Sequence, residues 1–210
     1  MDYKVPFISN TKDNLHCMQS AWMMVVKYFK PQFEMDWDKF SRVTGFEEDK
    51  GTWAMAGLLW LKKQGFNVIH LASFDYEVFA QTGGAYLLKR AGKDIGQWMI
   101  EHSNMPLEQK RARRLAKSGI WKKQAVQISD IKKNLDDGFL VVCTINIRKL
   151  DELQGYFGHV VVVKGYDDKK LFLHDPGLPG RPDRKVTYKD FETAWADPNK
   201  DAKELNAIKL

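Results

Sequence analysis

The sequence predicts an α+β fold with an antiparallel sheet, and three observations support this prediction. Apolar residues recur at three- and four-residue spacings in the first third of the chain, a pattern typical of buried helices. The last third contains short runs rich in β-branched and aromatic residues, which are typical of strands. No internal repeat or low-complexity tract is present. Helices followed by strands in this order are characteristic of α+β proteins.

The length and composition predict one folded domain over residues 1–210. A chain of 210 residues can bury a substantial core. Hydrophobic residues make up 44% of the chain and charged residues 29%, as in ordinary globular proteins, and this balance excludes wholesale disorder.

The first predicted helix follows a polar loop, Asn10 to Asn14. Apolar residues then recur from Cys17 to Phe29, and Pro31 ends the pattern. The density of apolar residues indicates that this helix is largely buried. Cys17 lies in its first turn.

The middle of the chain is predicted to be mostly helical. Residues Thr52 to Gln64 form a helix pattern that Gly65 closes, and Phe66 to Leu71 then has the pattern of a strand. From Tyr76 to Gly119 the pattern is again mostly helical. We interpret residues 74–127 as a helical insertion in the domain.

The last third is predicted to be dominated by strands. A short helix is expected from Ile128 to Asp137, a hairpin turn at Asp167 to Lys169, a loop from Pro176 to Pro182 and a closing helix from Tyr188 to Trp195. The predicted strands are Phe139 to Ile147, Val160 to Tyr166 and Lys170 to His174.

The charge distribution favours an acidic partner without identifying one. The formal net charge is +6. Seven of the positive charges lie between Lys110 and Lys123, a segment without acidic residues. The simplest interpretation is a solvated helix face, and the alternative is a binding site for an acidic protein, a nucleic acid or an anionic lipid. Aromatic residues are sparse in this segment, so nucleic-acid binding is not favoured.

Several classes of protein are excluded by what the sequence lacks. Its apolar stretches are too short for a membrane span, and no secretory signal is recognisable, so we expect a cytoplasmic protein. Two cysteines are too few for a disulfide scaffold, although the sequence leaves open whether the two form a single disulfide bond. The histidines show no metal-binding spacing, and dinucleotide- and phosphate-binding loops are absent. We therefore expect neither a metal nor a cofactor.

Three residues together could perform nucleophilic catalysis. The helix N-terminus at Cys17 favours a thiolate, which is the reactive form of cysteine. His159 follows a glycine at the start of a predicted strand, and Asp175 follows the next predicted strand. Adjacent strands of a hairpin would bring these two side chains together. The pattern predicts a thiol nucleophile, a base and a group that orients the base.

The other cysteine and histidines are predicted to be structural. Cys143 lies within an apolar strand, which favours core packing. His16 is expected to point away from its neighbour in the first helix, and His174 to lie on the opposite strand face from Asp175. His70 and His102 belong to no recognisable motif.

At these residues the chain resembles the papain-like cysteine peptidases, and among them the bacteriocin-processing peptidases that cleave double-glycine leaders. The order Cys, His, Asp along the chain is the order found in these peptidases. His159 follows Cys17 by 142 residues (159 minus 17), within the roughly 130 to 150 typical of papain-like enzymes. The segments that carry the resemblance are Val5 to Asn10, Cys17 with its helix, Ile131 to Ile147, Gly158 to Tyr166, His174 to Pro176 and Phe191 to Trp195. The middle block, 74–127, is not covered.

The resemblance implies a papain-like fold and a thiol hydrolase that cleaves a peptide or amide bond in a peptide or protein substrate through an acyl-enzyme. Cys17 would attack the substrate, His159 would transfer the proton and Asp175 would orient the imidazole. Asn10 stands where the family has a Gln that donates to the oxyanion hole, and Met18 stands where a Gly is common.

These two departures leave an alternative open. The chain could be a catalytically weak or inactive relative that binds a peptide or an acidic partner, and a third hypothesis is a basic adaptor whose insertion carries the function. Protease, amidase and acyltransferase activities are not distinguished by the sequence.

Overall fold

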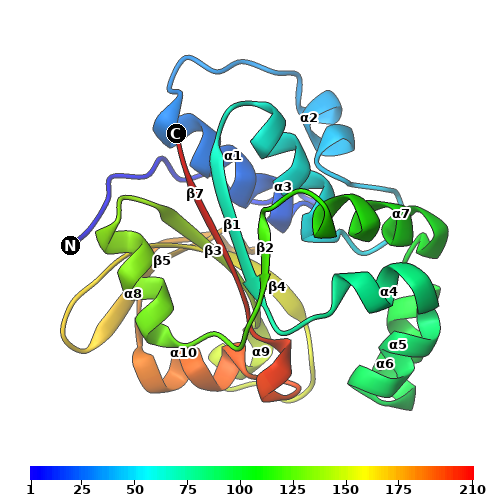
Figure 1. Ribbon diagram of the computed structural model, residues 1–210. Helices are drawn as coiled ribbons and strands as arrows, with labels where there is room; N and C mark the ends of the chain where they lie inside the picture. Colours follow the sequence, from blue (N-terminus) through cyan, green and yellow to red (C-terminus); the bar gives the residue numbers. More distant parts are fainter.

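The computed structural model describes residues 1–210 as helices packed on both faces of one seven-stranded sheet (Figure 1). The strands are β1 (Asn67–Ala72), β2 (Trp121–Lys123), β3 (Leu140–Asn146), β4 (Gly158–Tyr166), β5 (Lys170–Asp175), β6 (Arg181–Thr187) and β7 (Glu204–Lys209). The helices are α1 (Cys17–Phe29), α2 (Trp37–Val43), α3 (Ala54–Lys63), α4 (Tyr76–Thr82), α5 (Gly84–Ala91), α6 (Lys93–Glu101), α7 (Met105–Ala116), α8 (Ile128–Asp136), α9 (Ile147–Leu150) and α10 (Tyr188–Trp195), with a 3₁₀ turn at Lys200–Ala202.

The strands lie in the order β2-β1-β7-β3-β4-β5-β6. All neighbouring pairs are antiparallel except β1 and β2, which are parallel. The α+β prediction is therefore confirmed, and the expected antiparallel sheet is corrected at one pair. The reason is that the chain between β1 and β2 contains four helices, and a crossover of that length can carry the chain back to the end of the sheet where β1 began, so that β2 runs parallel to β1.

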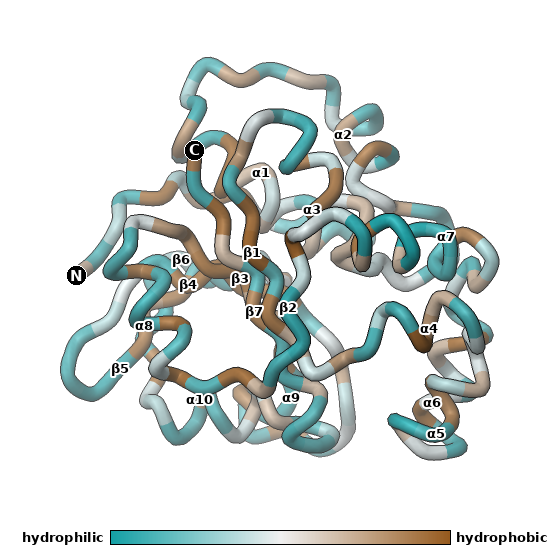
Figure 2. Tube along the Cα trace, viewed as in Figure 1, coloured by the Kyte–Doolittle hydropathy of each residue, from teal (hydrophilic) through white to brown (hydrophobic).

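The sheet separates two hydrophobic cores because alternate strand residues face opposite sides. One core lies under α1 and α3, and the other lies under α8 and α10. Figure 2 shows the resulting apolar band along the central strands. Leu140, Val142, Val160 and Val162 belong to the first core, and Val141, Cys143, Val161 and Val163 to the second.

Helix α1 is the most deeply buried helix of the first core, and its observed bounds match the prediction. A helix that is apolar around most of its circumference must be enclosed, and Trp22 and Met24 have no exposed surface. Burial of each large apolar side chain contributes about 1.5–3 kcal/mol to folding. Gly57 of α3 allows close contact, because a Cβ there would overlap the Trp22 indole. This packing fixes the N-terminus of α1 relative to the sheet.

Helices α4 to α7, which we call the helical block (residues 76–116), lie beside one edge of the sheet (Figure 1). The mostly helical content predicted here is confirmed. A buried hydrogen-bond chain attaches the block to the sheet: His70 contacts the Asn206 side-chain oxygen at 2.7 Å and the Tyr76 hydroxyl at 2.9 Å. His70 therefore has a structural role.

The basic segment 110–123 is partly neutralised within the chain. Arg111 forms ion pairs with Glu108 and Glu47, and Lys123 pairs with Asp75 at 2.5 Å. Arg113 donates to a backbone carbonyl of α4. These contacts agree with a solvated helix face that also stabilises the fold, and nothing in the structure favours the acidic partner predicted from the charge.

The helices and strands that have strong apolar patterns in the sequence were predicted, and those that have weak patterns were not. The helices at 17–29, 52–64, 128–137 and 188–195 and the strands at 66–71, 139–147, 160–166 and 170–174 are confirmed within about two residues. The sequence did not predict α2, α9, β2, β6 or β7, and β6 begins inside the loop expected up to Pro182. None of the helices has the length and hydrophobicity that crossing a bilayer requires.

Candidate active site

The antiparallel hairpin of β4 and β5 brings His159 and Asp175 together. His159 is the second residue of β4, and Asp175 is the last residue of the neighbouring β5. Their side chains meet with 2.7 Å between His159 Nε2 and Asp175 Oδ1. Both residues are only 2% exposed, so the pair is shielded from water. The predicted contact between them is present.

Asp175 is held by three donors. Besides the imidazole, the backbone N–H of Gly177 donates to Oδ1 at 3.0 Å, and Arg184 on β6 donates to Oδ2 at 3.0 Å. Burial alone would raise the pKa of Asp175, but these hydrogen bonds and the charge of His159 lower it below its usual value. Asp175 is therefore a fixed anion beside the imidazole.

Arg184 is itself oriented by a second carboxylate. Its other guanidinium nitrogen donates to Asp151 Oδ1 at 2.5 Å, and Arg181 donates to the same oxygen at 2.6 Å. The charges thus alternate from His159 through Asp175 and Arg184 to Asp151. This alternation compensates for the cost of burying the carboxylate of Asp175.

Cys17 is the first residue of α1, and His159 is its charged neighbour. Burial would raise the pKa of the thiol, but the hydrogen bond and charge of His159, together with the backbone N–H groups of Val160 and Met18, lower it. Burial would lower the pKa of His159, but its bonds to Asp175 and Cys17 raise it to about 9. Both shifts act in the direction that favours a thiolate–imidazolium pair.

Cys143 has the opposite environment. It is fully buried in the second core, and burial raises the pKa of its thiol well above the usual value. Its predicted role in core packing is confirmed. The two cysteines, both of them free, therefore differ in the direction of their pKa shifts, because only Cys17 has a cationic neighbour.

His16 and His174, predicted to be structural, have partners outside the Cys17–His159–Asp175 set. His16 stacks on Phe46 with 3.9 Å between ring centroids, and its Nδ1 lies 2.8 Å from the Thr11 hydroxyl. His174 Nε2 lies 2.9 Å from the Val5 carbonyl oxygen.

The loop before α1 places Asn10 differently from the prediction. We expected the Asn10 amide to point into the cleft as an oxyanion donor. Instead its Oδ1 accepts from the backbone N–H groups of Thr11 and His16, and its Nδ2 donates to Asn14 Oδ1 at 2.9 Å. Asn10 is buried and organises the loop from inside, because its side chain is too short to extend beyond these partners.

Met18, which replaces the glycine common in the family, does not occupy the cleft. Its side chain is 5% exposed and packs in the first core. The methionine at this position therefore adds to the first core and does not narrow the cleft.

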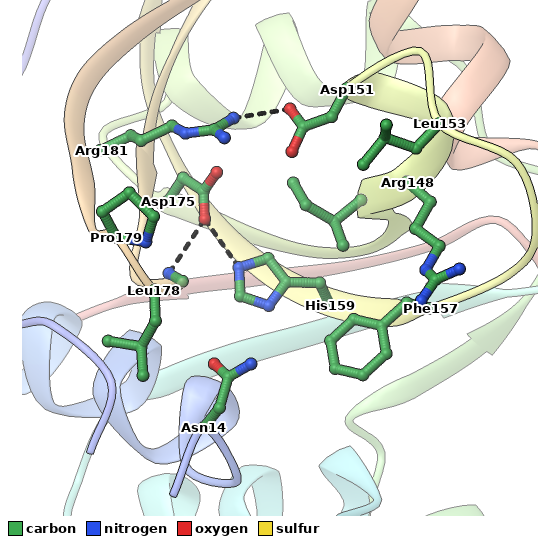
Figure 3. A pocket seen from close by; sticks show the side chains of 12 residues that line it. Asn14, Arg148, Asp151, Leu153, Phe157, His159, Asp175, Leu178, Pro179 and Arg181 are labelled. Carbon is green, nitrogen blue, oxygen red and sulfur yellow. Dashed lines mark hydrogen bonds and ion pairs between the residues drawn. The ribbon is translucent and has the colours of Figure 1, made fainter. Parts of the chain in front are cut away.

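A pocket of about 250 Å³ opens beside His159 (Figure 3). One wall is formed by Leu178 and Pro179, and Asn14 lies across from them with its amide directed into the pocket (Figure 3). The remaining lining residues are Ile147, Arg148, Asp151, Leu153, Phe157, Asp175, Gly177 and Arg181. Charged and apolar groups alternate around the opening, which suits a substrate with both kinds of group.

The sequence did not identify Asn14 or Arg184 as residues of the site. Asn14 has φ = +61°, a left-handed conformation that asparagine adopts more readily than most residues. An asparagine at the end of a polar loop before the cysteine was the available signal. Arg184 belongs to a polar edge strand whose sequence shows no regular alternation of apolar residues.

Cys17 at the start of α1 and the buried His159–Asp175 pair on the sheet form a Cys–His–Asp arrangement typical of the papain-like class of cysteine peptidase folds. The sequence profile of the Peptidase_C39 like family matches residues 4–203. The chain belongs to this family, and the match continues through residues 74–127. No curated protein sequence matches the chain.

Two solved structures share the fold over nearly the whole chain. One is a double glycine motif protease from an AMS/PCAT transporter in complex with its leader peptide (TM-score 0.52, 16% identity, 99% of this chain and 93% of that chain). The other is a putative C39-like peptidase from Bacillus anthracis (TM-score 0.56, 16% identity, 99% and 96%). The papain-like fold and the family predicted from the sequence are thus confirmed.

Proposed function

We propose that the protein is a thiol hydrolase that cleaves a peptide or amide bond through an acyl-enzyme, with Cys17 as nucleophile, His159 as acid and base, and Asp175 as the group that orients the imidazole. The observation that supports this most directly is that one imidazole lies 2.7 Å from the Asp175 carboxylate and lowers the pKa of the Cys17 thiol through a hydrogen bond and its charge.

The proposed reaction has two steps. The Cys17 thiolate attacks the carbonyl carbon, a C–S bond forms, and the imidazolium of His159 gives its proton to the leaving nitrogen as the C–N bond breaks. Water then attacks the thioester, His159 takes a proton from it, and the thiolate departs with the carboxylic acid released. Asp175 stays ionised and stabilises the imidazolium in both steps.

A peptide is the proposed substrate class. The structurally similar transporter protease binds a leader peptide, and the pocket beside His159 offers both apolar and charged groups to an extended chain. The backbone N–H of Cys17 begins α1 and has no acceptor within the chain, so it is free to bind a substrate oxygen.

Labelling with iodoacetamide at pH 7, followed by mass spectrometry of peptides, tests the nucleophile. We expect Cys17 to react far faster than Cys143, because the pKa of the Cys17 thiol is lowered and that of the Cys143 thiol is raised. Cys17→Ala removes the fast reaction, and Cys143→Ala is the matched control that retains it. Equal, slow labelling of both cysteines would contradict the proposed nucleophile and favour an inactive, peptide-binding relative.

A further inference from the structure

We infer that Asn14, rather than Asn10, supplies the side-chain donor of the oxyanion hole, and that Asn10 positions it. The inference rests on the proposed function, because an oxyanion forms only if Cys17 attacks a carbonyl group. It depends on a hydrogen-bond network that determines which way each amide faces.

The orientation of Asn10 follows from backbone donors. The N–H groups of Thr11 and His16 both point to one atom of the Asn10 amide, at 2.9 and 2.8 Å. A backbone N–H can only donate, so that atom is the oxygen, and the nitrogen must lie on the other branch of the amide.

The orientation of Asn14 follows in turn. Asn10 Nδ2 can only donate, so its partner at 2.9 Å is Asn14 Oδ1. The Nδ2 group of Asn14 is therefore on the opposite branch, and it has no acceptor anywhere in the chain. Asn14 lines the pocket together with His159, and Figure 3 shows its amide entering the pocket. The free donor thus belongs to an amide that enters the pocket beside His159.

The loop holds Asn14 in this position. Its backbone N–H donates to the Thr11 carbonyl at 2.9 Å, and Asp13 accepts from the Thr11 hydroxyl and from the Leu15 N–H. Cys17 follows only three residues later, with its own backbone N–H also free. One side-chain donor and one backbone donor on the same short segment are the two groups that a tetrahedral oxyanion requires.

The test compares two reactions of the same thiol. Acylation of Cys17 by p-nitrophenyl acetate forms a C–S bond, passes through an oxyanion and releases p-nitrophenolate. Alkylation by iodoacetamide displaces iodide without an oxyanion. Asn14→Gly removes the amide and tolerates the positive φ, so we expect acylation to slow by about 100-fold. The alkylation rate should stay within about twofold of wild type.

Asp49→Gly is the matched control, because Asp49 also has a positive φ (+58°) but lies on an exposed turn away from the pocket. This variant should acylate and alkylate at wild-type rates. Asn14→Asp keeps the shape of the side chain but replaces the donor with a negative charge, so its acylation should be slower than that of Asn14→Gly.

Three results would overturn the inference. Unchanged acylation in Asn14→Gly would show that Asn14 donates nothing to the oxyanion. An equal loss of acylation and alkylation would show that Asn14 only shapes the loop. A wild-type protein whose Cys17 alkylates rapidly but is never acylated would remove the proposed hydrolase function itself, and this inference with it. The first two results leave the proposed function intact.

Discussion

The two halves of the candidate site are held in different ways. On the strand side, ionised groups in alternating order fix His159 and Asp175 from β4, β5 and β6. On the loop side, neutral amides and backbone groups contact Asn14 directly, and a single carboxylate, Asp13, supports the loop around it. In the proposed mechanism, the strand side places the proton and the loop side places the hydrogen-bond donors. We therefore expect variants on the two sides to affect different steps.

The largest effect is expected for His159→Ala. Loss of the imidazole removes both the cation that stabilises the Cys17 thiolate and the acid that protonates the leaving group, so peptide cleavage should fall about 1000-fold or more. Alkylation of Cys17 at pH 7 should slow as well, unlike the result expected for Asn14→Gly. His102→Ala, at the residue that follows α6, is the matched control and should leave both rates unchanged. Rapid alkylation without His159 would contradict the role of the strand side.

A smaller effect is expected for Asp175→Asn, and it has a defined dependence on pH. The wild-type alkylation rate should rise at a pH below the ordinary thiol range, because His159 lowers the pKa of Cys17. Without the Asp175 anion the pKa of His159 drops from about 9, less imidazolium is present at neutral pH, and the pKa of Cys17 rises. The inflection should therefore move to higher pH, with about 10-fold slower alkylation at pH 7. An unmoved inflection would show that Asp175 does not influence the pair.

The smallest effect on chemistry, but a measurable one on stability, is expected for Arg184→Met. This change removes the guanidinium that donates to the buried Asp175 carboxylate, which then keeps only the imidazole as a charged partner, and urea unfolding should show a loss of about 3 kcal/mol. Arg181→Met is the comparison, because Arg181 also pairs with Asp151 but its side chain is 42% exposed. Exposed pairs contribute about 0–1 kcal/mol. Equal losses in the two variants would contradict the importance of the Arg184 contact.

The strand side was predictable because its geometry is local. His159 and Asp175 are 16 residues apart on adjacent strands, and the alternation of apolar residues fixes which face each side chain occupies. Helix α1 was equally predictable, since its apolar pattern is dense and Pro31 follows it. These features depend on patterns within a few residues of each functional group.

The loop side was not predictable because it depends on a single backbone conformation and on a chain of side-chain contacts. No periodicity in the sequence predicts the positive φ of Asn14. Nor does any pattern predict that the Asn10 oxygen accepts from the His16 N–H. The edge strand β6 was missed for a related reason. It is polar and half exposed, so tertiary pairing with β5 rather than an apolar pattern defines it.

The position of β7 in the sheet has a consequence for how the protein folds. This strand lies between β1 and β3, and its contacts include a pair, His70 and Asn206, that are 136 residues apart in the chain. Closing so long a loop is entropically slow, whereas the β4–β5 hairpin closes over a few residues. The hairpin with His159 and Asp175 should gain protection early in refolding followed by pulsed hydrogen exchange, and β1 should be protected last. The sheet becomes continuous only when β7 pairs with both β1 and β3. The helical block, which is attached through β1 and β2, is therefore expected to reach its fixed position relative to the hairpin at the end of folding.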